Sequence, residues 1–165
     1  MRNAVGSSDA VLMPVHVNRG KCYIEEQFIN DPMVDVGLVN ACIERTRFPV
    51  PEESWYAATD DFPGLVRAAD LIGQLSDRRY LHKLAAIFFE FAETGFNNKA
   101  GYKSPGDLLA AYPRFFDMAV APYITDAERY LKATTEGVEI LDHLYDNLAV
   151  AQKHSVADFS ASAQN

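Results

Sequence analysis

The chain has 165 residues, of which 48% are hydrophobic and 23% charged; this size favours one domain with a full hydrophobic core. Its 23 acidic and 15 basic side chains give a net charge of −8. That balance argues against general binding to nucleic acids or to anionic membranes, because both require basic surfaces. The sequence contains no run of about 18 apolar residues that would span a membrane. Cys22 and Cys42 have no partner at metal-ligand spacing and are expected to be buried thiols of a cytoplasmic protein.

Helical patterns follow one another along the chain, and no segment alternates with the period of two that is typical of strands. Residues 1–13 and 151–165 are expected to be flexible tails, and residues 14–150 a single helical domain. The first helix is predicted over residues 20–29 and ends before Pro32. Asp35 is a candidate N-cap for the second helix, which stops before Pro49.

A loop is predicted over residues 49–61, followed by a third helix that starts after Pro63. Asp60 and Asp61 precede that helix, where carboxylates interact favourably with the helix dipole. A fourth helix is predicted to be capped by Asp77 and to end at Gly95, with a loop over residues 96–103 after it.

Ser104 and Pro105 predict the start of the next helix, with serine as the N-cap and proline at the first helical position. Pro113 lies inside that helix and is expected to shorten or kink it. Thr125 is predicted to cap a last helix that runs to Leu148. A bend at a glycine within it is expected, since glycine costs about 1 kcal/mol relative to alanine. The predicted fold class is all-α.

Asp70 is the residue that points most directly to chemistry. It lies within the third helix beside small and aliphatic residues. A carboxylate buried there without a partner would cost several kcal/mol, so Asp70 is expected to be mostly buried and to have a partner. Arg67 lies one turn earlier on the same helix; a polar network or a metal ion could also satisfy the charge. A structural ion pair and a functional carboxylate therefore both remain open.

The segment Ala68–Gly73, AADLIG, resembles the closing Asp motif of the HD superfamily of metal-dependent phosphohydrolases. Two earlier segments, residues 16–21 and 38–46, are similar to helices that precede this motif, and the resemblance covers about residues 14–80. Residues 80–148 look like the helical extension of a cyanobacterial-type subgroup. The resemblance implies a partial HD-domain-like helical bundle with a C-terminal extension. It also implies hydrolysis of a phosphate ester or nucleotide.

In this superfamily a divalent metal ion is bound by a first His, a His-Asp pair and the late Asp. The resemblance therefore makes Asp70 and His16 ligands of Mn, Mg, Fe, Ni or Zn. It makes Asp70 and Arg67 catalytic residues, and Arg19 and Lys21 contacts for a phosphorylated substrate. The chain contains no His-Asp dipeptide, which implies a truncated or degenerate relative, because two ligands are fewer than the three or four of a stable transition-metal site. The alternative is a non-catalytic helical binding or assembly module on the same scaffold.

Two spatial expectations follow from the resemblance. The side chains of His16 and Asp70 are expected within about 12 Å of each other, near enough for a shared metal environment. In the HD scaffold, early helices cover one side of the Asp helix. Without them an apolar face would be exposed, and a symmetric homodimer is the expected way to cover it.

Overall fold

Eight α-helices and a short 3₁₀ helix form the described part of this computed structural model, which comprises Leu12 and residues 14–162, with side chains as far as Ser155. No strand occurs in these residues, which confirms the predicted all-α class. The elements are α1 (His16–Phe28), α2 (Val36–Arg45), η2 (Ser54–Ala57), α3 (Phe62–Leu75), α4 (Tyr80–Glu93), α5 (Phe96–Ala100), α6 (Pro105–Ala119), α7 (Ala121–Leu131) and α8 (Thr135–Ser162).

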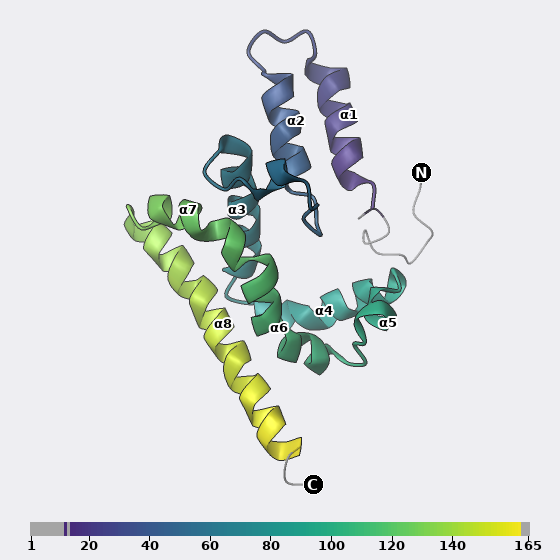
Figure 1. Cartoon of the computed structure of the whole chain (residues 1–165), viewed down its shortest axis with the longest axis vertical. Coiled ribbons are helices and arrows are strands. Elements are labelled where there is room, and N and C mark those ends of the chain that lie inside the picture. Colours follow the sequence, from purple (N-terminus) through teal and green to yellow (C-terminus); the bar gives the residue numbers. More distant parts are fainter. Residues whose placement is uncertain (1–11, 13, 163–165) are drawn as a thin grey trace.

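The hydrophobic core lies between α3, α6, α7 and α8 (Figure 1). The long helix α8 packs along α6 and also contacts α7 and α3, while α3 packs on α7. Side chains at helical spacing supply this core from all four helices, as their apolar patterns predict. The buried members are Ala68, Ile72, Leu75, Tyr112, Phe116, Val120, Ile124, Ala127, Leu141, Leu144, Leu148 and Ala151.

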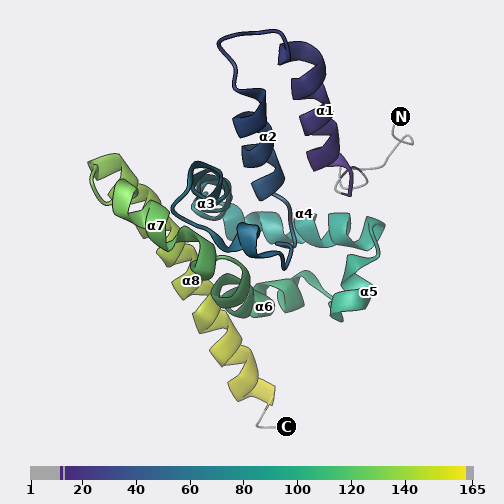
Figure 2. The same ribbon diagram turned by 45° about the horizontal axis from the view of Figure 1, so that its top comes forward.

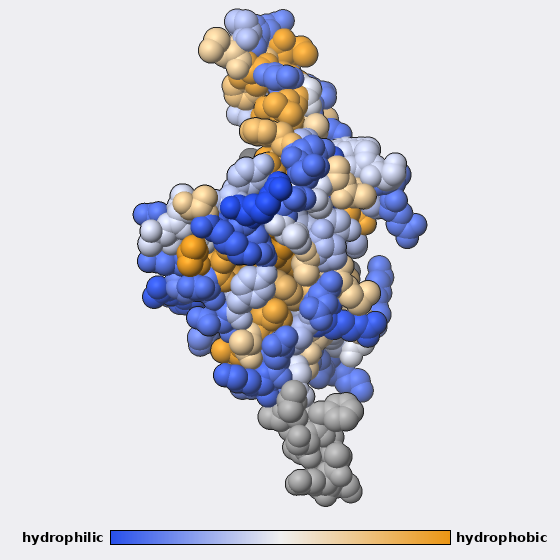
Figure 3. Space-filling view, turned by 60° about the vertical axis from the view of Figure 1, so that its left-hand side comes forward, coloured by the Kyte–Doolittle hydropathy of each residue, from blue (hydrophilic) through white to orange (hydrophobic). Residues whose placement is uncertain are grey.

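Helices α1 and α2 form a hairpin that projects from the rest of the molecule (Figures 1 and 2). Helix α2 packs on α3, and α1 packs on α2. Within the two helices only Val17 and Arg45 are buried, so the hairpin has almost no core of its own. Figure 3 shows apolar residues gathered at its projecting end. The large apolar residues exposed on the hairpin and its connecting loop are Tyr23, Ile29, Met33 and Leu38.

Three helix starts follow the capping residues in the sequence. Asp35 accepts a hydrogen bond from the backbone N–H of the third residue of α2, at 2.9 Å. Asp61 caps α3 in the same way at 2.8 Å. Ser104 and Asp107 form a reciprocal capping box at the start of α6. By contrast, α1 begins at His16, four residues before the predicted start.

The second half of the chain departs from the predicted boundaries. The expected loop after Gly95 contains the short helix α5, and α6 continues through Pro113 rather than ending there. The single last helix is in fact two, α7 and α8. Thr125 is not a cap but lies inside α7, where its hydroxyl donates to the Ala121 carbonyl at 3.3 Å. Helix α8 extends to Ser162, so residues 151–162 of the expected C-terminal tail are helical. The expected N-terminal tail lies outside the described residues, apart from Leu12.

Gly137 of α8 packs against Leu131 at the end of α7. It belongs to the first turn of α8, and its backbone N–H donates to the Thr134 hydroxyl at 3.0 Å. A Cβ atom at this position would lie 2.1 Å from the carbonyl oxygen of Leu131 and 2.7 Å from its Cα. Only a residue without a side chain fits between the two helices here.

Glu44 links the hairpin helices to the loop that follows them. Its carboxylate accepts hydrogen bonds from Lys21 of α1 at 2.9 Å, from Arg47, and from the Tyr56 hydroxyl at 2.7 Å. The hydrogen bonds from Arg47, assisted by those from Lys21 and Tyr56, lower the pKa of Glu44 from 4.5 to about 2 despite its partial burial.

We expect stability to decrease as the pH falls from about 4.5 to about 2, through protonation of Glu44. The folded-state pKa lies below the unfolded value, so the stabilisation is fully present above the unfolded pKa and is lost as pH falls through the folded one. Urea unfolding from neutral pH down to about pH 2 should therefore give a shallower acid dependence for Glu44→Gln than for the wild type. Glu26→Gln, at an exposed position of α1, is the control. Identical acid profiles for the wild type and Glu44→Gln would contradict the assignment.

Candidate functional site

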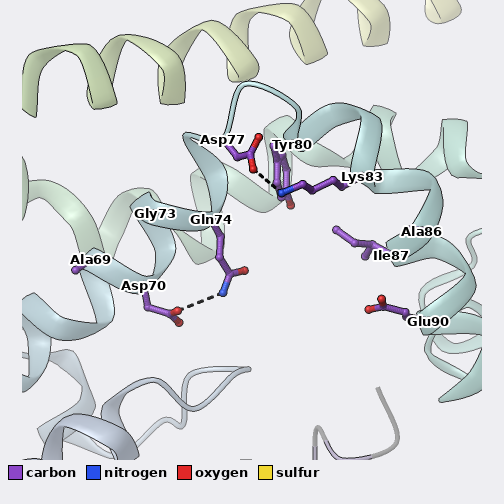
Figure 4. Close-up of a pocket in the computed structure, with 10 residues that line it drawn as sticks. All are labelled: Ala69, Asp70, Gly73, Gln74, Asp77, Tyr80, Lys83, Ala86, Ile87 and Glu90. Atoms are coloured by element: carbon purple, nitrogen blue, oxygen red, sulfur yellow. Dashed lines mark hydrogen bonds and ion pairs between the residues drawn. The ribbon is translucent and has the colours of Figure 1, made fainter. Parts of the chain in front are cut away.

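A hollow with a volume of about 620 Å³ lies between α3 and α4. Figure 4 shows the two helices as its walls, joined by the turn that contains Asp77. Buried Asn147 of α8 fixes that turn, because its amide donates to the carbonyls of Leu75 at 2.8 Å and Asp77 at 2.9 Å. The lining residues are Ala69, Asp70, Gly73, Gln74, Asp77, Tyr80, Lys83, Ala86, Ile87 and Glu90.

Asp70 lies in this hollow, but the prediction that it is buried is wrong, since the residue is exposed. Its carboxylate accepts a hydrogen bond from the amide of Gln74 at 3.2 Å. Ala69 and Gly73 beside it are exposed as well. The apolar stripe of α3 instead runs through Ala68 and Ile72, so Asp70 faces away from the core.

An ion pair with Arg67 was one of the alternatives for Asp70, but the two residues form none, because Arg67 points into the protein and is only 2% exposed. Its guanidinium donates to the carbonyls of Tyr56 at 2.8 Å and Ala58 at 3.2 Å and lies 4.0 Å from the ring centre of Tyr123. Burial, with the neighbouring charge of Arg45, lowers the pKa of Arg67. Arg67 therefore fixes the loop before α3 to α7 and is turned toward the protein interior, whereas Asp70, one turn later, is exposed.

Arg45 completes the same structural cluster from α2. It donates to the Ala58 carbonyl at 2.6 Å and pairs with Asp61 at 2.7 Å. Its guanidinium also lies 4.2 Å from the ring centre of Trp55. Asp61 is thus both a helix cap and an ion-pair partner, which confirms the structural interpretation for this carboxylate. We call Arg45, Asp61 and Arg67 the arginine cluster.

The other site residues predicted from the sequence belong to α1. His16 and Arg19 are exposed, and Lys21 pairs with Glu44 at 2.9 Å. Helix α1 packs on α2, whereas Asp70 faces α4. The proximity of His16 to Asp70 and the substrate contacts of Arg19 and Lys21 stay predictions.

A divalent metal ion was expected at Asp70 and His16. Within residues 12 and 14–162, no group of three or more His, Cys, Asp or Glu side chains comes together as a metal site would require. These residues therefore do not make a complete metal centre by themselves.

The two cysteine thiols also differ from the expectation that they are buried, because Cys22 is exposed and Cys42 is half-buried.

Sequence reasoning missed the α4 wall of the hollow. Lys83 forms an ion pair with Asp77, and the hydrogen bond from Lys83, together with one from the Arg79 backbone, lowers the pKa of Asp77. Glu90 extends from α4 toward the space between the helices (Figure 4). The spacing of Lys83, Ile87 and Glu90 along one face of a helix is the signal that could have grouped them.

Comparison with known proteins places the chain in a family. A family model described as Npun_R2479-like matches residues 1–154, so the chain belongs to the Npun_R2479-like family. No curated protein and no solved structure matches it. Among the helices of the described residues, none is long and apolar enough to cross a membrane.

Proposed function

We propose that this member of the Npun_R2479-like family forms part of a metal-dependent phosphohydrolase of the HD type, acting on a phosphate ester or nucleotide, in which Asp70 supplies a metal ligand. One observation carries the proposal. The carboxylate of Asp70 is exposed in the hollow between α3 and α4, and no salt bridge within the described residues neutralises it. A carboxylate that is to bind a cation must have such access.

The proposal assigns only part of a metal centre to the described residues. Asp70 and His16 would provide two ligands, whereas a stable site needs three or four. Further ligands must therefore come from outside these residues. Arg67 has no part in the proposal, because its guanidinium is occupied by backbone carbonyls. The exposed Arg19 remains the most accessible candidate among the predicted contacts for phosphate oxygens.

Metal content and hydrolysis, measured on the same samples, test the proposal. The protein is purified without chelator, supplied with Mn, Mg, Fe, Ni or Zn, and assayed with p-nitrophenyl phosphate and bis(p-nitrophenyl) phosphate. We expect Asp70→Asn to lower bound metal and hydrolysis by about tenfold or more, as the loss of a ligand does. Asp142→Asn, at an exposed position of α8, should leave both unchanged. Bound metal below about a tenth of an equivalent in the wild type would overturn the proposal.

The second candidate function is a non-catalytic helical binding or assembly module. It is favoured by the projecting hairpin, whose exposed apolar side chains Tyr23, Ile29 and Met33 offer a surface for self-association. Light scattering of the 18.4 kDa chain at micromolar concentration should then give the mass of a homodimer. Phosphate ester hydrolysis that disappears in a folded Asp70→Ala variant would refute a purely non-catalytic role.

A further inference from the structure

Helix α4 is apolar in sequence but poorly buried. Its 14 residues include three phenylalanines and only one buried residue, Leu84, whereas α3, of the same length, has five. Ile87 is half-buried, and Phe89 is 65% exposed. One face of α4 packs on α5 and α6, while the face with Ile87 lines the hollow opposite α3. Ile87 therefore leaves part of its apolar side chain in contact with solvent on this face, whereas Phe89 does not line the hollow.

Small residues make the hollow accessible to another backbone. Ala69 and Gly73 line it from α3 and Ala86 from α4. A Cβ atom built on Gly73 would meet no atom within 4 Å, so the space above this residue is open. Packed helices approach each other to about 8–10 Å between axes, and small side chains at the contact favour the closer approach. The small side chains that line the hollow therefore allow a third helix to pack between α3 and α4. We call this hollow the α3–α4 groove.

The charge of the groove defines what fits it. Asp70 and Glu90 extend from opposite walls (Figure 4), and neither has a salt bridge within the described residues. Lys83, the basic residue in the lining, is paired with Asp77. Two unpaired carboxylates therefore face the mouth, and a positively charged occupant is favoured. A second copy presenting the same face would bring like charges together, which disfavours it.

We propose that the α3–α4 groove docks an amphipathic basic helix of another polypeptide. The apolar face of that helix packs against Ile87 and the small residues, and a lysine or arginine of the helix lies between Asp70 and Glu90. This is the helix-in-groove mode of recognition, with anchors at intervals of three and four residues. The inference goes beyond the phosphohydrolase proposal and does not depend on it, because it uses Asp70 and Glu90 as carboxylates that pair with a basic side chain and needs no metal ion.

The test uses a synthetic helical peptide of leucine and lysine arranged on opposite faces, with a leucine–glutamate peptide of the same pattern as its control. Fluorescence anisotropy gives the affinity, and amide shifts in a ¹⁵N spectrum give the location. We expect saturable binding of the basic peptide only, with shifts concentrated in α3 and α4. Gly73→Leu fills the groove and Glu90→Lys reverses its charge; each should weaken binding by about tenfold.

A matched variant separates groove binding from general attraction to an acidic protein. Glu139→Lys makes the same charge change as Glu90→Lys at an exposed site on α8, outside the groove. It should keep the affinity within about twofold of the wild type. Circular dichroism confirms that each variant is folded.

Equal weakening by Glu90→Lys and Glu139→Lys, or full affinity in Gly73→Leu, would overturn the inference. A homodimer that Gly73→Leu converts to a monomer would also overturn it, because the occupant would then be a second copy. Metal content is measured on the same samples. A chain that binds the peptide but no metal supports this inference while refuting the phosphohydrolase proposal.

Discussion

Arg67→Ala is expected to lower the free energy of unfolding by about 2–4 kcal/mol. The loss comes from charge-assisted hydrogen bonds and from a desolvated cation–π contact. It is partly offset because the variant no longer buries a charged group. The substitution removes the donor to the Tyr56 carbonyl and one of two donors to the Ala58 carbonyl. It also removes the guanidinium from the ring of Tyr123 on α7. Urea unfolding followed by circular dichroism measures the loss.

Two further variants show whether the shape of the guanidinium matters. Arg67→Lys keeps the charge but cannot donate to two carbonyls from a planar fork, so it should recover only part of the lost stability. Arg19→Ala, at an exposed position of α1, should change stability by less than about 0.5 kcal/mol. An Arg67→Ala variant as stable as Arg19→Ala would contradict the structural role of the arginine cluster.

Gly137→Ala is expected to destabilise the protein by about 1–3 kcal/mol or more, although alanine is normally the better helix former. The added Cβ would lie 2.1 Å from the carbonyl oxygen of Leu131. Because the obstructing atoms belong to the backbone, α7 and α8 must move apart to accept it. That movement disturbs the packing of Ile124 and Leu141 in the core.

Gly73→Ala provides the matched comparison, because it makes the same substitution in α3 where no atom lies within 4 Å of the new Cβ. It should stabilise the protein by about 0.5–1 kcal/mol. The two glycine variants are therefore expected to shift the thermal unfolding midpoint in opposite directions. Shifts of the same sign would show that the contact between α7 and α8 adapts to the added methyl group.

Local signals were sufficient to predict much of the fold. Asp35 and Ser104 were correctly predicted as caps, because a cap depends on the neighbouring residues. The predictions for Asp77 and Thr125 were wrong, since Arg79 is the N-cap of α4 and Thr125 lies inside α7. The separation of α7 from α8 could not be seen in this way. The apolar pattern continues across the break, and the turn is favoured by the close contact between Gly137 and Leu131, which exists only once the two helices have packed.

The candidate site was predicted less well, for two physical reasons. Each helical residue advances by about 100°, which places Asp70 about 200° from buried Ala68. The small and aliphatic neighbours of Asp70 suggested a buried position, but one of them, Ala69, is itself exposed. Glu90 was not predicted as a site residue, because the α3–α4 groove that it lines depends on the angle between two helices. Asn147 of α8 fixes the turn that joins them, and no local pattern connects it to α4.

The contact between Asn147 and Leu75 has a consequence for how the protein is made. The two residues are 72 positions apart, and a ribosome adds about 5–20 residues per second. Asn147 of α8 is therefore synthesised roughly 4–14 s after Leu75, at the end of the apolar stripe of α3. During that interval Ile72 and Leu75 have no native cover from α8. We therefore expect ribosome-associated chaperones to bind the nascent chain. This binding should end only when α8 has emerged from the ribosome and can cover α3.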